Sequence, residues 1–164
     1  MEIVFDSSTL ILMAKTGFLR IAVKNYQAII PEAVMKECTG GDFDDARLIK
    51  MLVDDGAIAV AKKINRKDIA RLRSDFKTHF GEAEAIVLAL TKKCPIATDD
   101  LLAIKACRIL NVPFVTAMHF LIRFAEKGEI DRTAALYYFE KLSSYARYDQ
   151  RILDDAFTRI KGGK

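Results

Sequence analysis

The sequence EIVFDSSTLIL, residues 2–12, decides the fold. It opens with the apolar run Ile3, Val4 and Phe5, which has the length of a short buried strand, and a helical pattern begins after Asp6. Asp6 therefore lies where a strand ends and a helix begins. In open α/β sheets the ligand crevice lies beyond the carboxyl ends of the strands. We therefore expect the Asp6 carboxylate to point into such a crevice.

The alternation of a short strand with longer helical segments continues along the chain. Strands are expected at residues 2–5, 28–30, 57–60, 96–98 and 114–115, and the residues beyond Thr116 are helical to the end. This rhythm predicts an α/β fold, a three-layer α/β/α arrangement with a central, mostly parallel sheet of about five strands, plus C-terminal helices. With 164 residues the chain is long enough for about one domain with a substantial core.

Composition restricts the class of protein. The chain is 51% hydrophobic and 29% charged, and it contains no apolar run of the roughly 18 to 20 residues that cross a bilayer. No signal peptide is recognisable at the N-terminus, so we expect a cytoplasmic protein without a membrane span. Cys38, Cys94 and Cys107 are widely spaced and are expected to be free thiols. The net charge of +4 is compatible with a nucleic-acid partner.

Further acidic residues occur at comparable junctions between strands and helices. They are Glu37, Glu82, Glu84, Asp99 and Asp100. Each has a structural explanation by itself, as a helix cap, as a favourable charge in a first helical turn, or as a surface group. Parallel strands, however, bring their carboxyl ends to one edge of the sheet, so the acids are expected to converge there with Asp6. Because clustered carboxylates repel one another, they favour a hard divalent cation such as Mg²⁺ or Mn²⁺.

A second acidic stretch follows Gly41. Asp42, Asp44 and Asp45 resemble the start of a calcium loop, but the sixth and twelfth positions of such a loop, which need Gly and Glu, hold Arg47 and Val53. We therefore interpret this stretch as a solvated turn and helix start.

Residues 64–78 form a charged helical pattern with a candidate N-cap at Asn65. Its basic side chains are Arg66, Lys67, Arg71, Arg73 and Lys77. An ordinary solvated helix face is the favoured interpretation, and contact with phosphate groups is the alternative.

Taken in order, four short motifs resemble those of PIN-domain proteins, a family of metal-dependent ribonucleases that includes the toxins of toxin–antitoxin pairs. The motifs are IVFDSS at residues 3–8, PEAVMKE at 31–37, GEAEAI at 81–86 and ATDD at 97–100. The resemblance covers roughly residues 2 to 125. It implies a nuclease domain over residues 1–127 and a C-terminal helical extension over 128–164 that packs on the same domain.

Matched residue by residue, the resemblance implies catalytic roles for Asp6, Glu37, Glu84 and Asp100, with Glu84 in place of the more usual Asp. It assigns metal binding to Asp6, Glu84, Asp99 and Asp100, and supporting roles to Ser7 or Ser8, Glu82 and Thr98. Glu82 and Asp99 are additional acids that either take part in metal binding or lie next to the residues that bind the metal.

The activity implied by the resemblance is hydrolysis of RNA phosphodiester bonds with Mg²⁺ or Mn²⁺. Its implied partners are RNA, a small antitoxin protein and a second copy of the chain. The alternatives are a PIN-fold module that only binds RNA or protein, and an RNA-processing nuclease that is not a toxin. His79 and His119 are isolated beside a Phe and are expected to be packed or surface residues.

Two further hypotheses concern the surface and the fold. The aromatic side chains of residues 137–148 are expected mostly to pack on the domain, and any exposed remainder is a candidate dimer face or antitoxin groove. A flavodoxin-like or response-regulator fold also places acids at strand ends, but the chain lacks a convincing phosphate-binding loop or Asp–Lys pair for it.

Overall fold

The computed structural model describes residues 1–162, which fold around one parallel sheet. Its strands are β1 (Glu2–Phe5), β2 (Gln27–Pro31), β3 (Ile58–Ala61), β4 (Ile96–Ala97) and β5 (Phe114–Val115). They are ordered β3-β2-β1-β4-β5, and each neighbouring pair is parallel. The predicted α/β fold with about five strands is therefore confirmed.

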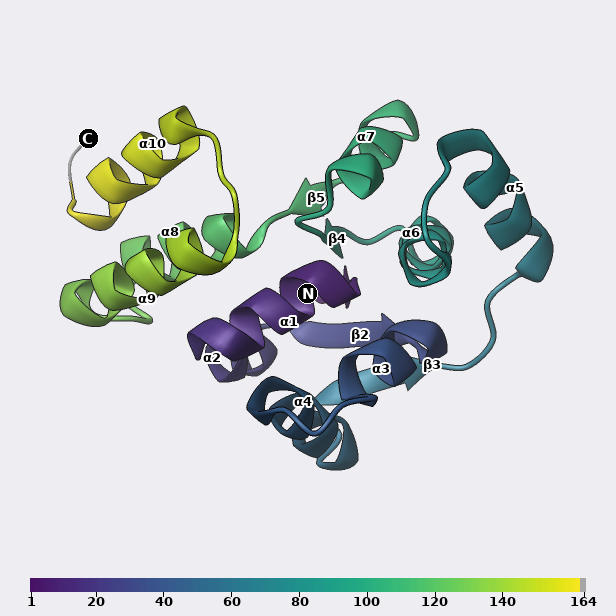
Figure 1. Ribbon diagram of the computed structural model, residues 1–164, viewed down its shortest axis with the longest axis horizontal. Helices are drawn as coiled ribbons and strands as arrows, with labels where there is room; N and C mark the ends of the chain where they lie inside the picture. Colours follow the sequence, from purple (N-terminus) through teal and green to yellow (C-terminus); the bar gives the residue numbers. More distant parts are fainter. Residues whose placement is uncertain (163–164) are drawn as a thin grey trace.

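Helices connect the strands and follow the last one (Figure 1). They are α1 (Ser7–Thr16), α2 (Leu19–Asn25), α3 (Glu32–Thr39), α4 (Asp44–Asp54), α5 (Arg66–Phe76), α6 (Phe80–Lys92), α7 (Leu101–Ile109), α8 (Ala117–Glu126), α9 (Arg132–Tyr145) and α10 (Gln150–Ile160). Within the described residues, none of these helices is long and apolar enough to cross a membrane.

The alternation of side chains along each strand divides the core between the two faces of the sheet. Ile3 and Phe5 of β1 belong to a cluster with α1 to α4 and α8 to α10, whereas Val4 between them packs with α5, α6 and α7. This is the period of two that a pleated strand imposes, and it buries the central strand on both sides. Figure 1 shows α5 to α7 on the right and α8 to α10 on the left.

The connections change sides next to β1. The helices between β1 and β3 pack on one face of the sheet, and α5, α6 and α7, which precede and follow β4, pack on the other. The boundary between β1 and β4 is therefore the topological switch point of the sheet. In such folds the ligand crevice opens at this point, beyond the carboxyl ends of the strands.

Local sequence signals explain most element boundaries. Gly17 ends α1 with a φ of 101°, a left-handed conformation that glycine adopts without strain. Asn65 caps α5 by accepting a hydrogen bond from the Lys67 N–H, so the predicted helix starts at residue 66 instead of 64. Pro31 is the last residue of β2 and directly precedes α3, whose first turn begins at Glu32.

The C-terminal helices share the core of the α/β unit. Ile130, Leu142 and Ile160 are buried in the same cluster as Phe5 and Leu10. Among the aromatic side chains of residues 137–148, the Tyr138 ring packs 5.7 Å from Phe18, while Tyr137 and Tyr145 are exposed. Burial of the helix faces explains why these helices remain attached to the domain.

All three cysteines, Cys38, Cys94 and Cys107, are buried free thiols. Cys38 lies in the core cluster on one face of the sheet, and Cys94 and Cys107 lie in the cluster on the opposite face.

Candidate functional site

Asp6 is the most deeply buried acid at the carboxyl edge of the sheet, with 0% exposure. It caps α1, because its Oδ1 accepts hydrogen bonds from the Thr9 N–H at 3.1 Å and the Ser8 hydroxyl at 2.7 Å. Its Oδ2 accepts a hydrogen bond from the hydroxyl of Thr98, which follows β4. Both carboxylate oxygens are thus held where β1 and β4 end.

The electrostatic environment of Asp6 is unfavourable for a charged group. Its pKa is raised from 3.8 to about 7, mainly by burial and to a smaller extent by the nearby Asp99, while the three hydrogen bonds act in the opposite direction. Within the described residues, Asp6 forms no ion pair with a Lys, Arg or His side chain. A buried carboxylate without a positive partner destabilises a fold, so its presence at the switch point indicates a functional role.

Asp99 connects four parts of the chain. Its Oδ2 accepts hydrogen bonds from the Thr9 hydroxyl at 2.5 Å and the Ala117 N–H at 2.9 Å, and its Oδ1 accepts one from the Tyr148 hydroxyl at 2.6 Å. Burial raises the Asp99 pKa, and these hydrogen bonds act in the opposite direction. The side chain therefore attaches α1, α8 and the segment between α9 and α10 to the end of β4.

The contact between Tyr148 and Asp99 predicts a stability effect. Tyr148→Phe removes a largely buried hydrogen bond to a carboxylate and is expected to lower the free energy of unfolding by about 1.5 kcal/mol. Tyr145→Phe is the matched control, because Tyr145 is exposed, and it is expected to change stability by less than about 0.5 kcal/mol. Urea unfolding measures both. Equal stability of the two variants would contradict a stabilising role for this contact.

Asp100 is held at the first turn of α7. Its Oδ1 accepts hydrogen bonds from the N–H groups of Leu102 at 2.8 Å and Ala103 at 2.9 Å. Its own N–H donates to the Thr98 hydroxyl oxygen at 3.2 Å, so Thr98 contacts both Asp6 and Asp100. The capping geometry fixes the direction of the Asp100 carboxylate.

Glu82 and Glu37 form the other part of the acidic site. The Oε2 of Glu82 accepts a hydrogen bond from the His79 N–H at 3.0 Å, which holds the side chain at the start of α6. The pKa of Glu82 is raised, first by burial and then by the charges of Asp100 and Glu37. A Cβ added at Gly81 would lie 2.9 Å from Glu37 Oε2, so the absence of a side chain there lets Glu37 approach α6.

Glu84 has a different environment from Glu82. Its Oε2 accepts a hydrogen bond from the Ala33 N–H at 3.2 Å, at the first turn of α3, and its side chain lines a groove with basic residues. Of the two adjacent serines, Ser8 and not Ser7 provides the hydroxyl that reaches Asp6.

The structure therefore places the acids in two groups whose charges interact. Asp6 interacts with Asp99, and Glu82 interacts with Asp100 and Glu37.

Two residues of this network have no recognisable sequence signal. Thr9 donates its hydroxyl to Asp99, 90 residues away, and Tyr148 donates to the same carboxylate from 49 residues away. Only the proximity of Thr9 to Asp6 could have drawn attention to it, whereas Tyr148 is one of several tyrosines in an aromatic stretch.

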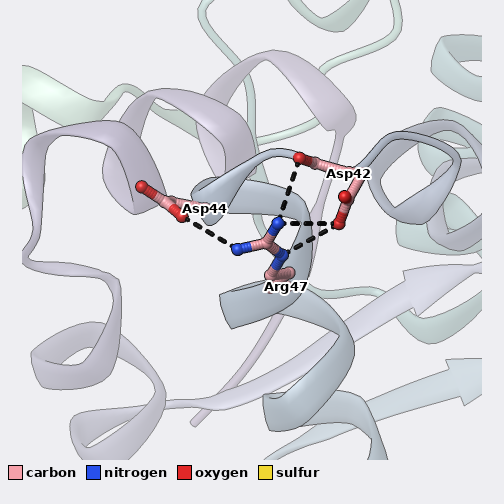
Figure 2. A network of polar contacts seen from close by, with 3 residues as sticks. All are labelled: Asp42, Asp44 and Arg47. Carbon is pink, nitrogen blue, oxygen red and sulfur yellow. Dashed lines mark hydrogen bonds and ion pairs between the residues drawn. The ribbon is translucent and has the colours of Figure 1, made fainter.

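The acids near Gly41 lie outside this site. Figure 2 shows Arg47 between Asp42 and Asp44, with ion-pair distances of 2.9 and 3.4 Å. These side chains are exposed, and the contacts support the interpretation of a solvated turn and helix start.

The chemistry of the donor set fits a hard divalent cation, because the site offers carboxylate and hydroxyl oxygens. Among residues 1–162, however, no group of three or more His, Cys, Asp or Glu side chains is already arranged to hold a metal ion. Burial is the largest cause of the raised pKa values of Asp6 and Glu82, and neighbouring carboxylates raise them further. Binding of a cation would therefore require rotation of some of these side chains.

Fold and site together define an α/β protein with a parallel sheet and a group of carboxylates at its topological switch point. A model of the DUF3368 family, described as a PIN domain, matches residues 2–161. The chain therefore belongs to this PIN-domain family. PIN-domain proteins are typically nucleases, and PIN nucleases generally use divalent metals.

A solved structure supports the fold. The crystal structure of PAE2754 from Pyrobaculum aerophilum is similar with a TM-score of 0.58 and 17% sequence identity, covering 76% of this chain and 96% of the other. No curated protein matches the chain significantly. The family match and the shared fold agree with the resemblance that the sequence motifs suggested.

Proposed function

We propose that the protein is a divalent-metal-dependent endoribonuclease that hydrolyses RNA phosphodiester bonds. The observation that carries this proposal is the buried Asp6 carboxylate at the switch point, with its pKa raised to about 7, Asp99 close by, and the Thr98 hydroxyl in contact with both Asp6 and the Asp100 N–H. A charge retained in such an environment indicates chemistry that needs it.

We assign Asp6, Glu37, Glu82 and Asp100 to the metal site. A Mg²⁺ or Mn²⁺ ion held there would supply a Lewis acid for hydrolysis of the phosphodiester. The hydroxyls of Ser8 and Thr98 orient Asp6, and the helix starts of α6 and α7 orient Glu82 and Asp100.

Asp99 and Glu84, to which the family resemblance assigned metal binding, receive other roles in this proposal. Asp99 already accepts three hydrogen bonds, so we assign it to positioning the end of β4. Glu84, bonded to the start of α3, faces the basic groove instead of the other acids and is not among the proposed ligands.

Cleavage of a fluorescent single-stranded RNA by the purified full chain tests the proposal. We expect cleavage with Mn²⁺, no cleavage with EDTA, and a reduction of at least about tenfold for Asp100→Asn. The Asn side chain still accepts the helix-capping hydrogen bonds, so the variant is expected to fold. Absence of cleavage under every metal condition would favour a PIN-fold module that binds without catalysis.

The cellular role proposed for this nuclease is that of a toxin with a small antitoxin partner. Production of the active chain in a bacterial host is then expected to arrest growth, while Asp6→Asn is tolerated. RNA cleavage without growth arrest would instead support an RNA-processing nuclease.

A further inference from the structure

A groove with a volume of about 650 Å³ lies beside the acidic site. It is bordered by α3, by the segment between β3 and α5, and by the facing sides of α5 and α6. Its charged and aromatic lining includes Lys36, Lys62, Arg66, Arg73, Phe80 and Glu84. Where two of its walls meet, Glu37 of α3 lies against Gly81 of α6, the residue after Phe80, so the groove lies next to this part of the acidic site.

The groove carries an excess of positive charge. Lys36 pairs with Glu32 at 2.9 Å, whereas Lys62, Arg66 and Arg73 take part in no ion pair within the described residues. Cationic side chains without an acidic partner can bind phosphate groups, and arginine can bind them through two nitrogens. The groove therefore suits a polyanion.

An aromatic side chain lies among these cations. Phe80 is large and apolar but remains 47% exposed, and the Arg73 guanidinium carbon lies 5.7 Å from the centre of its ring. An exposed ring next to a guanidinium plane provides a surface on which a nucleobase can stack. Bases inside a duplex are already stacked and paired, so this surface favours a single strand.

We propose that this groove binds single-stranded RNA next to the bond that is cut. Lys62, Arg66 and Arg73 contact consecutive phosphates, and Phe80 stacks against a base. Phe80 directly precedes Gly81, which lies against Glu37 of α3, so a strand held on the ring is close to the acidic site at Glu37. This inference rests on the proposed nuclease function for the choice of RNA as the nucleic acid.

The basic residues of α5 do not all line the groove. Arg73 lines the groove, whereas Arg71 lies in a different depression with Asp75, at 3.9 Å from its carboxylate. Arg71→Glu and Arg73→Glu therefore change the same helix and the same net charge but only one of them changes the groove. They form a matched pair of variants.

The test measures binding of a short fluorescent single-stranded RNA by anisotropy in EDTA, with Asp6→Asn protein to prevent cleavage. We expect Arg73→Glu to weaken binding by at least about tenfold and Arg71→Glu by less than about threefold. Equal losses in the two variants would overturn the groove as the binding site, because they would show only a response to net charge.

Two further comparisons test the stacking surface. Phe80→Ala is expected to weaken binding by about tenfold, while Phe80→Tyr keeps the affinity within about twofold of that of Phe80. A duplex of the same sequence is expected to bind at least about tenfold more weakly than the single strand. Unchanged binding by Phe80→Ala, or equal affinity for the duplex, would overturn the assignment to a single strand.

The results that would reject the groove proposal differ from those that would reject the nuclease proposal. If the wild-type chain cleaves RNA with Mn²⁺ but Arg73→Glu binds and cleaves as well as wild type, the groove proposal fails and the nuclease proposal stands. If no metal restores cleavage but the groove variants still lose RNA binding selectively, the groove proposal stands and the nuclease proposal fails.

Discussion

Asp6→Asn is expected to reduce RNA cleavage by roughly a thousandfold and to raise the melting temperature of the metal-free protein. The loss of activity follows from the proposed role of Asp6 as a metal ligand, because several kcal/mol of transition-state stabilisation correspond to about three orders of magnitude in rate. A neutral amide contributes much less to binding a hard cation than a carboxylate does.

The gain in stability follows from removal of a buried charge. The Asp6 pKa is raised from 3.8 to about 7 in the fold. The charged carboxylate therefore does not destabilise the fold below about pH 3.8, and its full destabilising effect is present above about pH 7. At about pH 8 the side chain is charged, and its neutral replacement is expected to raise the melting temperature by roughly 4 °C. The amide oxygen of Asn can still accept from Ser8 and Thr9, and its N–H₂ group can donate to the Thr98 hydroxyl.

Calorimetry and RNA cleavage on the same preparations measure both effects. Asp54→Asn is the control, since Asp54 lies on the exposed side of α4, and it is expected to change the melting temperature by less than about 1 °C. A lower melting temperature for Asp6→Asn would show that the charge of Asp6 stabilises the fold. Retained cleavage would remove Asp6 from the mechanism.

Local sequence patterns were sufficient to predict the main features of the fold and the position of one acid, Asp6, at the end of the first strand. The apolar run before Asp6 and the helical pattern after it locate the first junction, and the period of two in β1 follows from burial on both faces. The contact of Tyr148 with Asp99 could not be predicted, because it depends on how the segment between α9 and α10 returns to the sheet. No local pattern encodes a contact of that range.

The distinction between Glu82 and Glu84 also required the structure. Residues two positions apart on a helix point in directions about 200° apart, so a single rotation of α6 cannot direct both at the same site. The alternation of acid and alanine in GEAEAI is compatible with either rotation. The packing of α6 against α3 decides it, through the hydrogen bond from the Ala33 N–H to Glu84.

This difference leads to a prediction that compares two isosteric changes. Glu82→Gln is expected to reduce metal-dependent RNA cleavage by about a hundredfold, because Glu82 lies beside Asp100 and Glu37 and its neutral form binds a cation poorly. Glu84→Gln is expected to keep cleavage within about threefold of wild type. Its amide oxygen can still accept from the Ala33 N–H, and the loss of one negative charge makes the groove no less favourable for RNA.

The pair discriminates sharply because both variants lie on α6, keep the size of the side chain and remove the same charge. Any general effect of charge or helix stability would therefore appear in both. A large loss in Glu84→Gln with little loss in Glu82→Gln would make Glu84 the metal-binding acid of α6, and would require its side chain to leave Ala33 when the metal binds. Similar large losses in both would mean that the two carboxylates act in turn or together, which requires α6 to rotate or its first turn to unwind.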